Sequence, residues 1–292
     1  MRVLLDTKDV INLVQKSQPL SVSELDGILR KGRHEIVLSY VNITEIVAPL
    51  RQGVDFADIR PLLIALESLP ACYIRDSPIP GQELREAISA FEGNRDPNPV
   101  DPFVRRWDDV ITPFGESALR PIVGVRLWEI VQILYKQGAL PDYSREAGQL
   151  RAQFQAERAL PANQKQNLRD IFVKAVEANL RTYGLTPPAG GVVDFANWLY
   201  DNPRWCPAKR ITFEMYHSLL RNSTDIPKDS DILDLNHLKA LPYVDFLTLD
   251  RRMDSYLGAV VKGLVARDPA LQVRGKILRN LAEVLSAPEF AD

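Results

Sequence analysis

The chain opens on Arg2-Val-Leu-Leu5, a short apolar run that ends at Asp6 and Thr7. The length of this run, and the helical pattern after it, predict a buried strand of a parallel sheet. A similar arrangement closes the chain, where Val244-Asp-Phe-Leu-Thr248 is followed after one residue by Asp250. An acid therefore follows apolar strands predicted at opposite ends of the sequence.

Between these two strands, further strand and helix patterns alternate. Apolar runs predict two more strands, at 35–39 and 71–74. Apolar residues at helical spacing predict helices at 8–16, 21–29, 42–50, 58–69, 231–240, 254–266 and 269–285. Such alternation is typical of a doubly wound sheet. We therefore expect an α/β fold of three layers, in which helices cover both faces of a central parallel sheet.

The middle of the chain has a different pattern. Two stretches rich in Gly and Pro, 93–99 and 184–191, predict loops. Helical patterns lie around them, at 122–137, 164–183, 192–200 and 207–221. Because the strands on either side need each other to form a sheet, this region is predicted to be a helical insertion. The predicted organisation is an α/β domain formed by 1–80 and 226–292, the latter including C-terminal helices, interrupted by an insertion at 81–225.

Composition describes an ordinary globular protein with one basic segment. Of the 292 residues, 46% are hydrophobic and 25% are charged, which allows a sizeable core. The net charge of -2 lacks the basic surplus of a strong nucleic-acid binder. From Arg251 to Arg279, however, seven basic residues stand against two acids. This segment either contacts phosphates or forms solvated helix faces.

Cysteine usage and hydropathy give expectations about the cellular environment. Cys72 and Cys206 are far apart and form no Cys/His zinc pattern. No run reaches the roughly 18 apolar residues that a membrane span needs, and no secretory signal pattern opens the chain. We expect a cytoplasmic protein with reduced thiols and no membrane partner.

The acids around the predicted strands suggest a metal site. Asp6 and Asp250 follow strands, Glu45 lies in the helix after the second strand, and Asp231 and Asp234 precede the last strand. Ligands of open parallel sheets bind at the carboxyl ends of the strands, so these carboxylates should lie together. Their mutual repulsion would be relieved by Mg²⁺ or Mn²⁺, which prefer oxygen ligands. Two such ions can promote phosphodiester hydrolysis by water.

Each acid also has a structural alternative. The spacing from residue 42 to Glu45 fits a capping box, and Asp231 could be an N-cap with Asp234 as its third-position acid. Asp250 could simply begin a helix. Asp6 is hardest to explain this way, because an acid at the end of a buried strand needs a partner.

Other chemistries lack their motifs. The sequence has no GxxxxGK or GxGxxG phosphate loop and no GxSxG nucleophile elbow. His237 follows Asp234 by one helical turn, where it could face the site as a proton shuttle or phosphate contact, or be a satisfied helix residue.

Four stretches together resemble PIN-domain ribonucleases, which include the toxins of many bacterial toxin–antitoxin pairs. The stretches are Arg2–Thr7, Val37–Glu45, Asp231–His237 and Leu241–Arg251, and the resemblance covers roughly 1–75 and 228–255. It implies a PIN-like fold whose metal is held by Asp6, Glu45, Asp234 and Asp250, with Asp231 as an alternative or fifth acid. It also implies that the Thr7 hydroxyl supports the first carboxylate and that His237 assists.

The resulting functional hypothesis is an endoribonuclease that uses Mg²⁺ or Mn²⁺ and a metal-activated water. RNA is favoured over DNA, Arg251 and Arg252 would hold its backbone, and a protein partner or inhibitor could dock on the helical insertion. Two alternatives stay open. Lys8, where the family often has Asn, could occupy the metal position in a non-catalytic interaction protein, or the acids could serve a small-molecule phosphohydrolase.

Overall fold

The computed structural model describes residues 1–15, 20–75, 78–107, 110, 126–138, 144–160, 167–222, 228 and 230–291. Within these ranges a six-stranded sheet has the order β4-β3-β2-β1-β5-β6. The strands are β1 (Arg2–Leu4), β2 (Glu35–Ser39), β3 (Ala71–Ile74), β4 (Phe103–Val104), β5 (Phe246–Thr248) and β6 (Ile277–Leu278). Neighbouring strands pair in parallel except for β3 and β4, which are antiparallel.

Strand β1 lies at the centre of this sheet. Val3 is aligned with Ile36 of β2 on one side and with Phe246 of β5 on the other. The two ends of the chain thus build one sheet, which confirms the predicted α/β class and the joining of its two halves.

Helices occupy most of the remaining described chain. The first group comprises α1 (Thr7–Val14), α2 (Val22–Gly32), α3 (Tyr40–Val47), η1 (Ala48–Gln52), α4 (Phe56–Ser68) and α5 (Ile79–Gly93). The middle group comprises α7 (Leu127–Lys136), α8 (Ser144–Ala159), α9 (Leu168–Thr182), α10 (Val192–Asp201), η4 (Pro203–Trp205) and α11 (Pro207–Arg221). The last group comprises α12 (Ser230–His237), η5 (Leu238–Ala240), α13 (Arg251–Arg267), α14 (Leu281–Ser286) and α15 (Pro288–Ala291).

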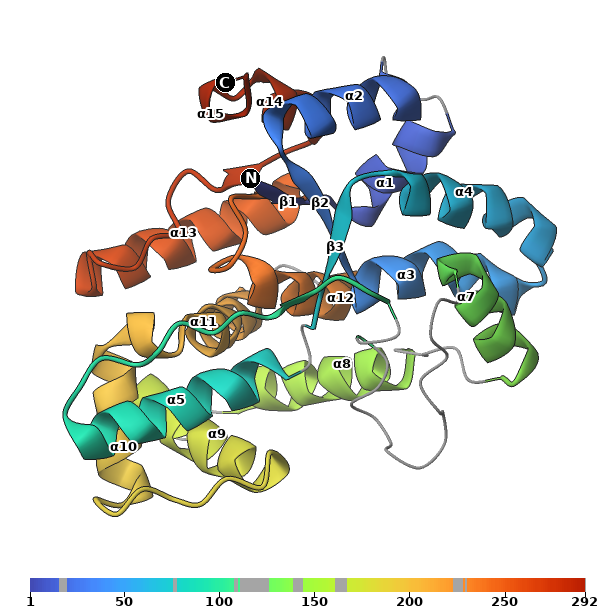
Figure 1. The fold of residues 1–292 in the computed structure, drawn as a ribbon. Helices are drawn as coiled ribbons and strands as arrows, with labels where there is room; N and C mark the ends of the chain where they lie inside the picture. The colour runs from blue at the N-terminus through green and yellow to red at the C-terminus, as the bar shows by residue number, and fades with distance from the viewer. Residues whose placement is uncertain are drawn as a thin grey trace.

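Alternating side chains of the strands build a separate hydrophobic core on each face of the sheet. In β1 and just after it, Val3 and Leu5 join one core, whereas Leu4 joins the other, as the two-residue period of a strand requires. The first core includes residues of α1, α2, α4 and α7, and the second includes residues of α8, α11 and α13. Figure 1 shows α1, α2 and α4 on one side of the strands and α11 and α13 on the other.

A third hydrophobic cluster lies away from the sheet. It joins α5, α9 and α10 through buried residues such as Leu84, Phe172 and Phe195, and these helices lie together at the lower left of Figure 1. The predicted insertion therefore contains a helical cluster of its own. It also supplies β4 to the sheet and α11 to the second core, which the prediction did not include. Its predicted boundaries stay a prediction, and residue 225 lies outside the described residues.

The C-terminal region corrects one predicted helix. Instead of a helix over 269–285, the chain forms a turn, strand β6 and the short helix α14. Asp268 has an extended backbone, with φ of -135°, and its carboxylate accepts from Ala270 N at 3.2 Å. Gly275 adopts φ of 75°, a left-handed conformation that glycine tolerates without strain. Together these residues redirect the chain towards the edge of the sheet.

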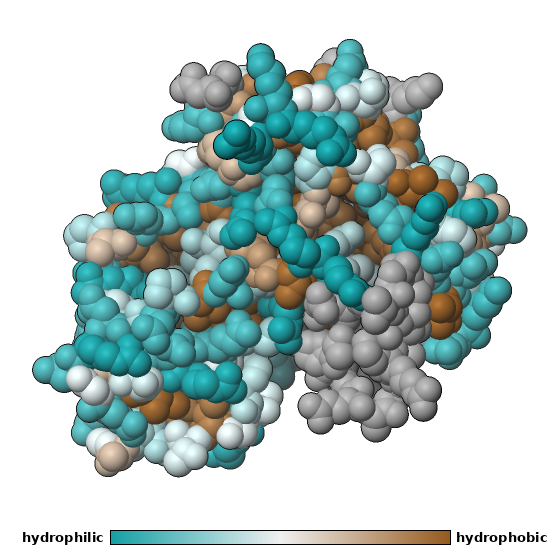
Figure 2. All heavy atoms as spheres, in the orientation of Figure 1, coloured by the Kyte–Doolittle hydropathy of each residue, from teal (hydrophilic) through white to brown (hydrophobic). Residues whose placement is uncertain are grey.

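Other helix predictions agree except at their ends, although α5, β4 and α8 were not predicted. The predicted helical positions 16, 122–125 and 164–166 lie outside the described residues. Among the described helices, none combines the length and apolar character that crossing a membrane requires. On the face shown in Figure 2, hydrophobic residues form small patches separated by hydrophilic ones.

Candidate functional site

The strand order places a topological switch point at β1. The chain passes from β1 to β2 on one side, whereas β5 lies on the other side. At such a switch point, the connections that follow the two neighbouring strands leave in opposite directions. In open parallel sheets, ligands bind there, at the carboxyl ends of the strands. Asp6 follows β1, Glu45 lies in α3 after β2, and Asp250 follows β5. Three of the predicted acids thus come from the connections that flank this position.

Asp6 is the N-cap of α1. Its Oδ1 accepts from Lys8 N at 2.8 Å, and its own N–H donates to the Thr248 hydroxyl oxygen at 2.7 Å. Burial raises the pKa of Asp6, while the Lys8 N–H and the charge of His237 oppose the rise. The charges of Glu45 and Asp250 add to the rise, which places Asp6 in the electrostatic field of the other predicted site residues.

Asp250 has the same role at the start of α13. Its Oδ1 accepts from Met253 N at 2.7 Å, so the helix-start interpretation of this acid is confirmed. A cap uses one carboxylate oxygen, and no described residue donates a hydrogen bond to the other oxygen of Asp6 or of Asp250. Capping and cation binding are therefore compatible at both acids.

Glu45 is held by Thr7, the first residue of α1, and the alternative in which Glu45 closes a capping box is wrong. The box of α3 is formed by Ser39 and Asn42, one turn earlier, which leaves Glu45 free of that role. Glu45 Oε2 instead accepts a short hydrogen bond from the Thr7 hydroxyl. The Thr7 oxygen accepts in turn from Asn42 Nδ2 at 3.0 Å. Thr7 was predicted to support Asp6, and this is corrected, because its hydroxyl donates to Glu45.

His237 belongs to the site. Its ring is buried, and Nε2 lies 3.5 Å from Glu45 Oε2. Burial alone would lower the pKa of His237, but the contact with Glu45 and the charges of Asp234 and Asp6 outweigh burial and raise it. The pKa of Glu45 shifts in the opposite direction. Burial alone would raise it, but the contact with His237 and the Thr7 hydroxyl outweigh burial and lower it.

Asp234 is the fourth predicted acid and the most strongly perturbed. Burial raises its pKa to about 7, and the charges of Asp6, Asp250 and Glu45 add to this effect against that of His237. A carboxyl group with this pKa carries a proton at neutral pH for much of the time, unless a cation replaces that proton. The charges of Asp6, Glu45 and Asp250 thus act on Asp234, and those of Glu45, Asp234 and Asp6 act on His237.

Asp231 does not join these acids, although it was predicted as an alternative ligand. Its side chain is fully buried and forms an ion pair with Arg252, whose second nitrogen donates to Oδ2 at 3.1 Å. Lys228 N donates to the same oxygen at 2.8 Å. The ion pair engages both carboxylate oxygens of Asp231. It also engages the guanidinium of Arg252, which was predicted to contact the nucleic-acid backbone. Arg251, the other predicted phosphate contact, is exposed.

Two polar residues near the site were missed by sequence reasoning. Thr248 is completely buried within β5, and its hydroxyl links the Asp6 backbone to Asp9. Asp9 is buried in α1, and its Oδ2 has no hydrogen-bond partner among the described residues. Thr248 could have been predicted as a residue near the site, because it is a polar residue inside an otherwise apolar strand and lies two residues before Asp250.

The described side chains do not form a ready-made chelating group. No three His, Cys, Asp or Glu residues in the described part of the chain lie as a metal site would require. The charges of Glu45 and Asp250 nevertheless raise the pKa values of Asp6 and Asp234.

Comparison with known proteins adds no relative. No family model, curated protein or solved structure matches this chain. The structure defines a mixed α/β protein with a mostly parallel sheet. The resemblance to PIN-domain ribonucleases stays a prediction that rests on the quoted motifs.

Proposed function

We propose that this protein is a metal-dependent nuclease that hydrolyses phosphodiester bonds, with RNA as its preferred substrate. The observation that carries the proposal is that the charges of Glu45, Asp234 and Asp6 act on His237, while the charge of Asp250 acts on Asp6 and Asp234, beside the central strand. These acids come from four separate segments, and the capping roles of Asp6 and Asp250 give no reason for Glu45 and Asp234 to lie near the same ligand-binding edge.

The donor set fits Mg²⁺ or Mn²⁺. All four acids offer hard oxygen atoms, and burial raises the pKa values of Asp6 and Asp234, an effect that the charge of a bound cation would oppose. Asp6, Glu45, Asp234 and Asp250 would hold the ion or ions. Bound there, the metal would neutralise the carboxylates and the substrate phosphate and promote the ionisation of water.

The residues of this chain would orient and balance the charges of the reaction. The caps of α1 and α13 hold Asp6 and Asp250 by one oxygen each, and the Thr7 hydroxyl holds Glu45. His237 would retain a proton beside Glu45. The exposed guanidinium of Arg251, directly after Asp250, would contact the phosphate backbone of the bound strand.

A blocked site is not favoured by the position of Lys8. Its side chain is exposed and forms no ion pair with any described acid, whereas the non-catalytic hypothesis needs its ammonium among the carboxylates. We further propose that the protein acts in the cytoplasm. Its two cysteines are buried and unpaired, as expected for reduced thiols. A protein partner that docks on the central segment also stays a proposal.

Cleavage of labelled single-stranded RNA and DNA of one sequence, with Mg²⁺, Mn²⁺ or EDTA, tests the function. Asp6→Asn should abolish cleavage, and Asp58→Asn should not, because Asp58 is an exposed acid in the first turn of α4. Native protein should also gain thermal stability with Mn²⁺, because a ligand bound only by the folded state stabilises it. Absence of both cleavage and stabilisation would instead support the non-catalytic interaction protein.

A further inference from the structure

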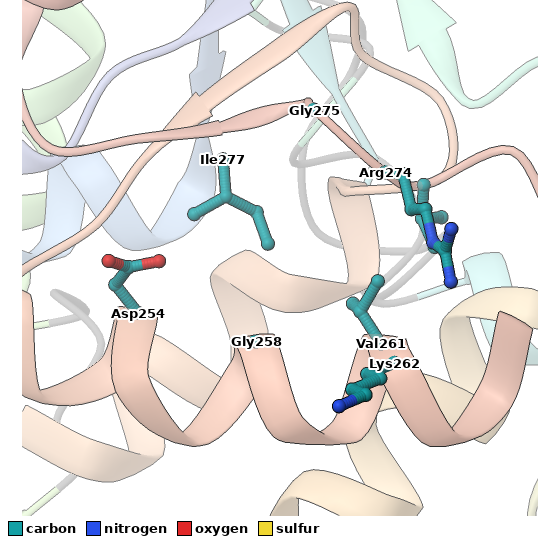
Figure 3. Close-up of a pocket in the computed structure, with 8 residues that line it drawn as sticks. Asp254, Gly258, Val261, Lys262, Arg274, Gly275 and Ile277 are labelled. Atoms are coloured by element: carbon teal, nitrogen blue, oxygen red, sulfur yellow. The ribbon is translucent and has the colours of Figure 1, made fainter.

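A groove lies along α13, beyond the acid site. It has a volume of about 410 Å³ and runs between α13 and the segment that leads into β6. Figure 3 shows Asp254, Gly258, Val261 and Lys262 on α13, with Arg274 and Ile277 on the facing segment. The groove is therefore formed by the same C-terminal region that carries the basic surplus in the sequence.

The charges of the groove are unevenly placed. Lys262 and Arg274 lie near each other towards one end in Figure 3, and both side chains belong to exposed residues. Asp254 lies towards the other end, where its Oδ2 is 3.9 Å from Arg279 Nε. The acid thus has a basic neighbour, and the cations near the groove outnumber it. An anionic ligand suits this arrangement.

The surface between these charges is apolar and open. Val261 is almost fully buried, and Ile277 points towards α13 in Figure 3. Gly258 and Gly275 leave open space, since an added Cβ at either position would contact nothing within 4 Å. A chain with charged groups along its backbone and flat apolar rings could therefore lie in the groove, with its charges at Lys262 and Arg274.

The groove is within reach of a strand bound at the acids. Asp250 caps α13, and the helix rise of about 1.5 Å per residue puts Lys262 roughly 18 Å further along the axis. One strand of a double helix advances about 3.4 Å along the helix axis per nucleotide, so about five nucleotides would cover this distance. An extended strand would need fewer. The exposed Arg251 lies at the beginning of this path.

Building on the nuclease function proposed above, we propose that the α13 groove is a second binding site for a single-stranded nucleic acid. Lys262 and Arg274 contact phosphates, while Ile277 contacts a sugar or base. Phosphate contacts position a strand without reading its sequence. The groove consequently favours substrates long enough to reach from the acids to Lys262, whatever their sequence.

Binding in EDTA separates this groove from metal-dependent chemistry. Fluorescence anisotropy would compare single-stranded RNAs of 16 and 4 nucleotides with native protein and with Lys262→Ala/Arg274→Ala. The control, Lys31→Ala/Arg85→Ala, removes two exposed cations outside the groove. Loss of two phosphate contacts should weaken binding of the longer RNA about tenfold at ~0.15 M salt and reduce the salt slope by ~1.4. The control pair and the shorter RNA should show less than a twofold change.

Equal loss in the two double variants, or no loss in either, would overturn the groove proposal. So would a Glu-rich peptide of 16 residues that binds more tightly than RNA and depends on Lys262 and Arg274, because the groove would then accept a protein segment. RNA binding that depends on this pair in a protein that never cleaves RNA would keep the groove and remove the nuclease function. Metal-dependent cleavage by the native protein, together with unchanged RNA binding by the groove variant, would keep the nuclease function and remove the groove proposal.

Discussion

Removal of Arg252 should destabilise the protein strongly without disabling the proposed metal site. Arg252 is the ion-pair partner of Asp231, whose side chain is 0% exposed. Arg252→Ala would leave a buried carboxylate with the Lys228 N–H but without its guanidinium. Breaking a buried pair on one side costs about 3–5 kcal/mol. Because the Arg252 side chain is 21% exposed, water can reach the pair, and we expect about 3 kcal/mol.

Urea unfolding of native protein, Arg252→Ala and Asp231→Asn/Arg252→Ala would measure this effect. The double variant should be more stable than Arg252→Ala, by about 1–2 kcal/mol, because no unpaired charge is left buried. The control is Arg30→Ala, which breaks the exposed pair with Asp26 on α2. Solvent screens that exposed pair, so Arg30→Ala should leave the stability close to that of the native protein.

Two results would refute this reasoning. The first is a loss below about 1 kcal/mol in Arg252→Ala, since it would mean that Asp231 does not depend on its partner. The second is an Mn²⁺ affinity in Asp231→Asn that falls as far as in Asp234→Asn. Asp231 would then be a metal ligand, as the sequence motif suggested, and the buried pair would not describe the metal-loaded protein.

Three further predictions concern the site and its support. In urea unfolding with EDTA at pH 8, Asp234→Asn should be about 2 kcal/mol more stable than the native protein. The pKa of Asp234 is raised to about 7 in the folded protein, so its protonated form stabilises the native protein at low pH and this contribution is lost as pH rises through about 7. The gain from the substitution should therefore shrink towards pH 4. No gain at pH 8 would contradict this. Thr7→Val should weaken Mn²⁺ binding about tenfold in a calorimetric titration, because Glu45 loses its hydroxyl donor, and an unchanged affinity would exclude this supporting role. Glu83→Gln should cost about 3 kcal/mol in urea unfolding and leave Mn²⁺ affinity unchanged. The buried Glu83 carboxylate accepts hydrogen bonds from two backbone N–H groups at the start of α11, and the NH₂ group of a glutamine would face one of these N–H groups without an acceptor. A change in metal affinity without loss of stability would contradict it.

The strands of the sheet were largely predictable because their signals are local. The ranges of β2 and β3 agree with the predicted ones, since each is a short apolar run between helical patterns. The two residues of β4 are too few to show a period. Helix α8 is mostly polar, with Phe154 as a buried contact, so it lacks the apolar stripe that identifies a surface helix.

The acids were predictable as a set, whereas their partners were not. Placement after strands was sufficient to bring Asp6 and Asp250 to one edge. Asp231 and Asp234 occupy one helical turn, and sequence spacing does not reveal which of them meets a distant arginine. The link from Asn42 through Thr7 to Glu45 likewise joins two segments that become neighbours only when β1 and β2 pair.

Helix α11 has a consequence for how the molecule comes apart. Its Ile211 and Met215 are part of the core beneath the sheet, while Phe213 packs with the cluster of α5, α9 and α10. Neither group of helices can therefore loosen without exposing apolar surface on a helix that the other also needs. Amide hydrogens of α9 and α10 should consequently exchange with solvent in step with those of β1, as members of one cooperative unit.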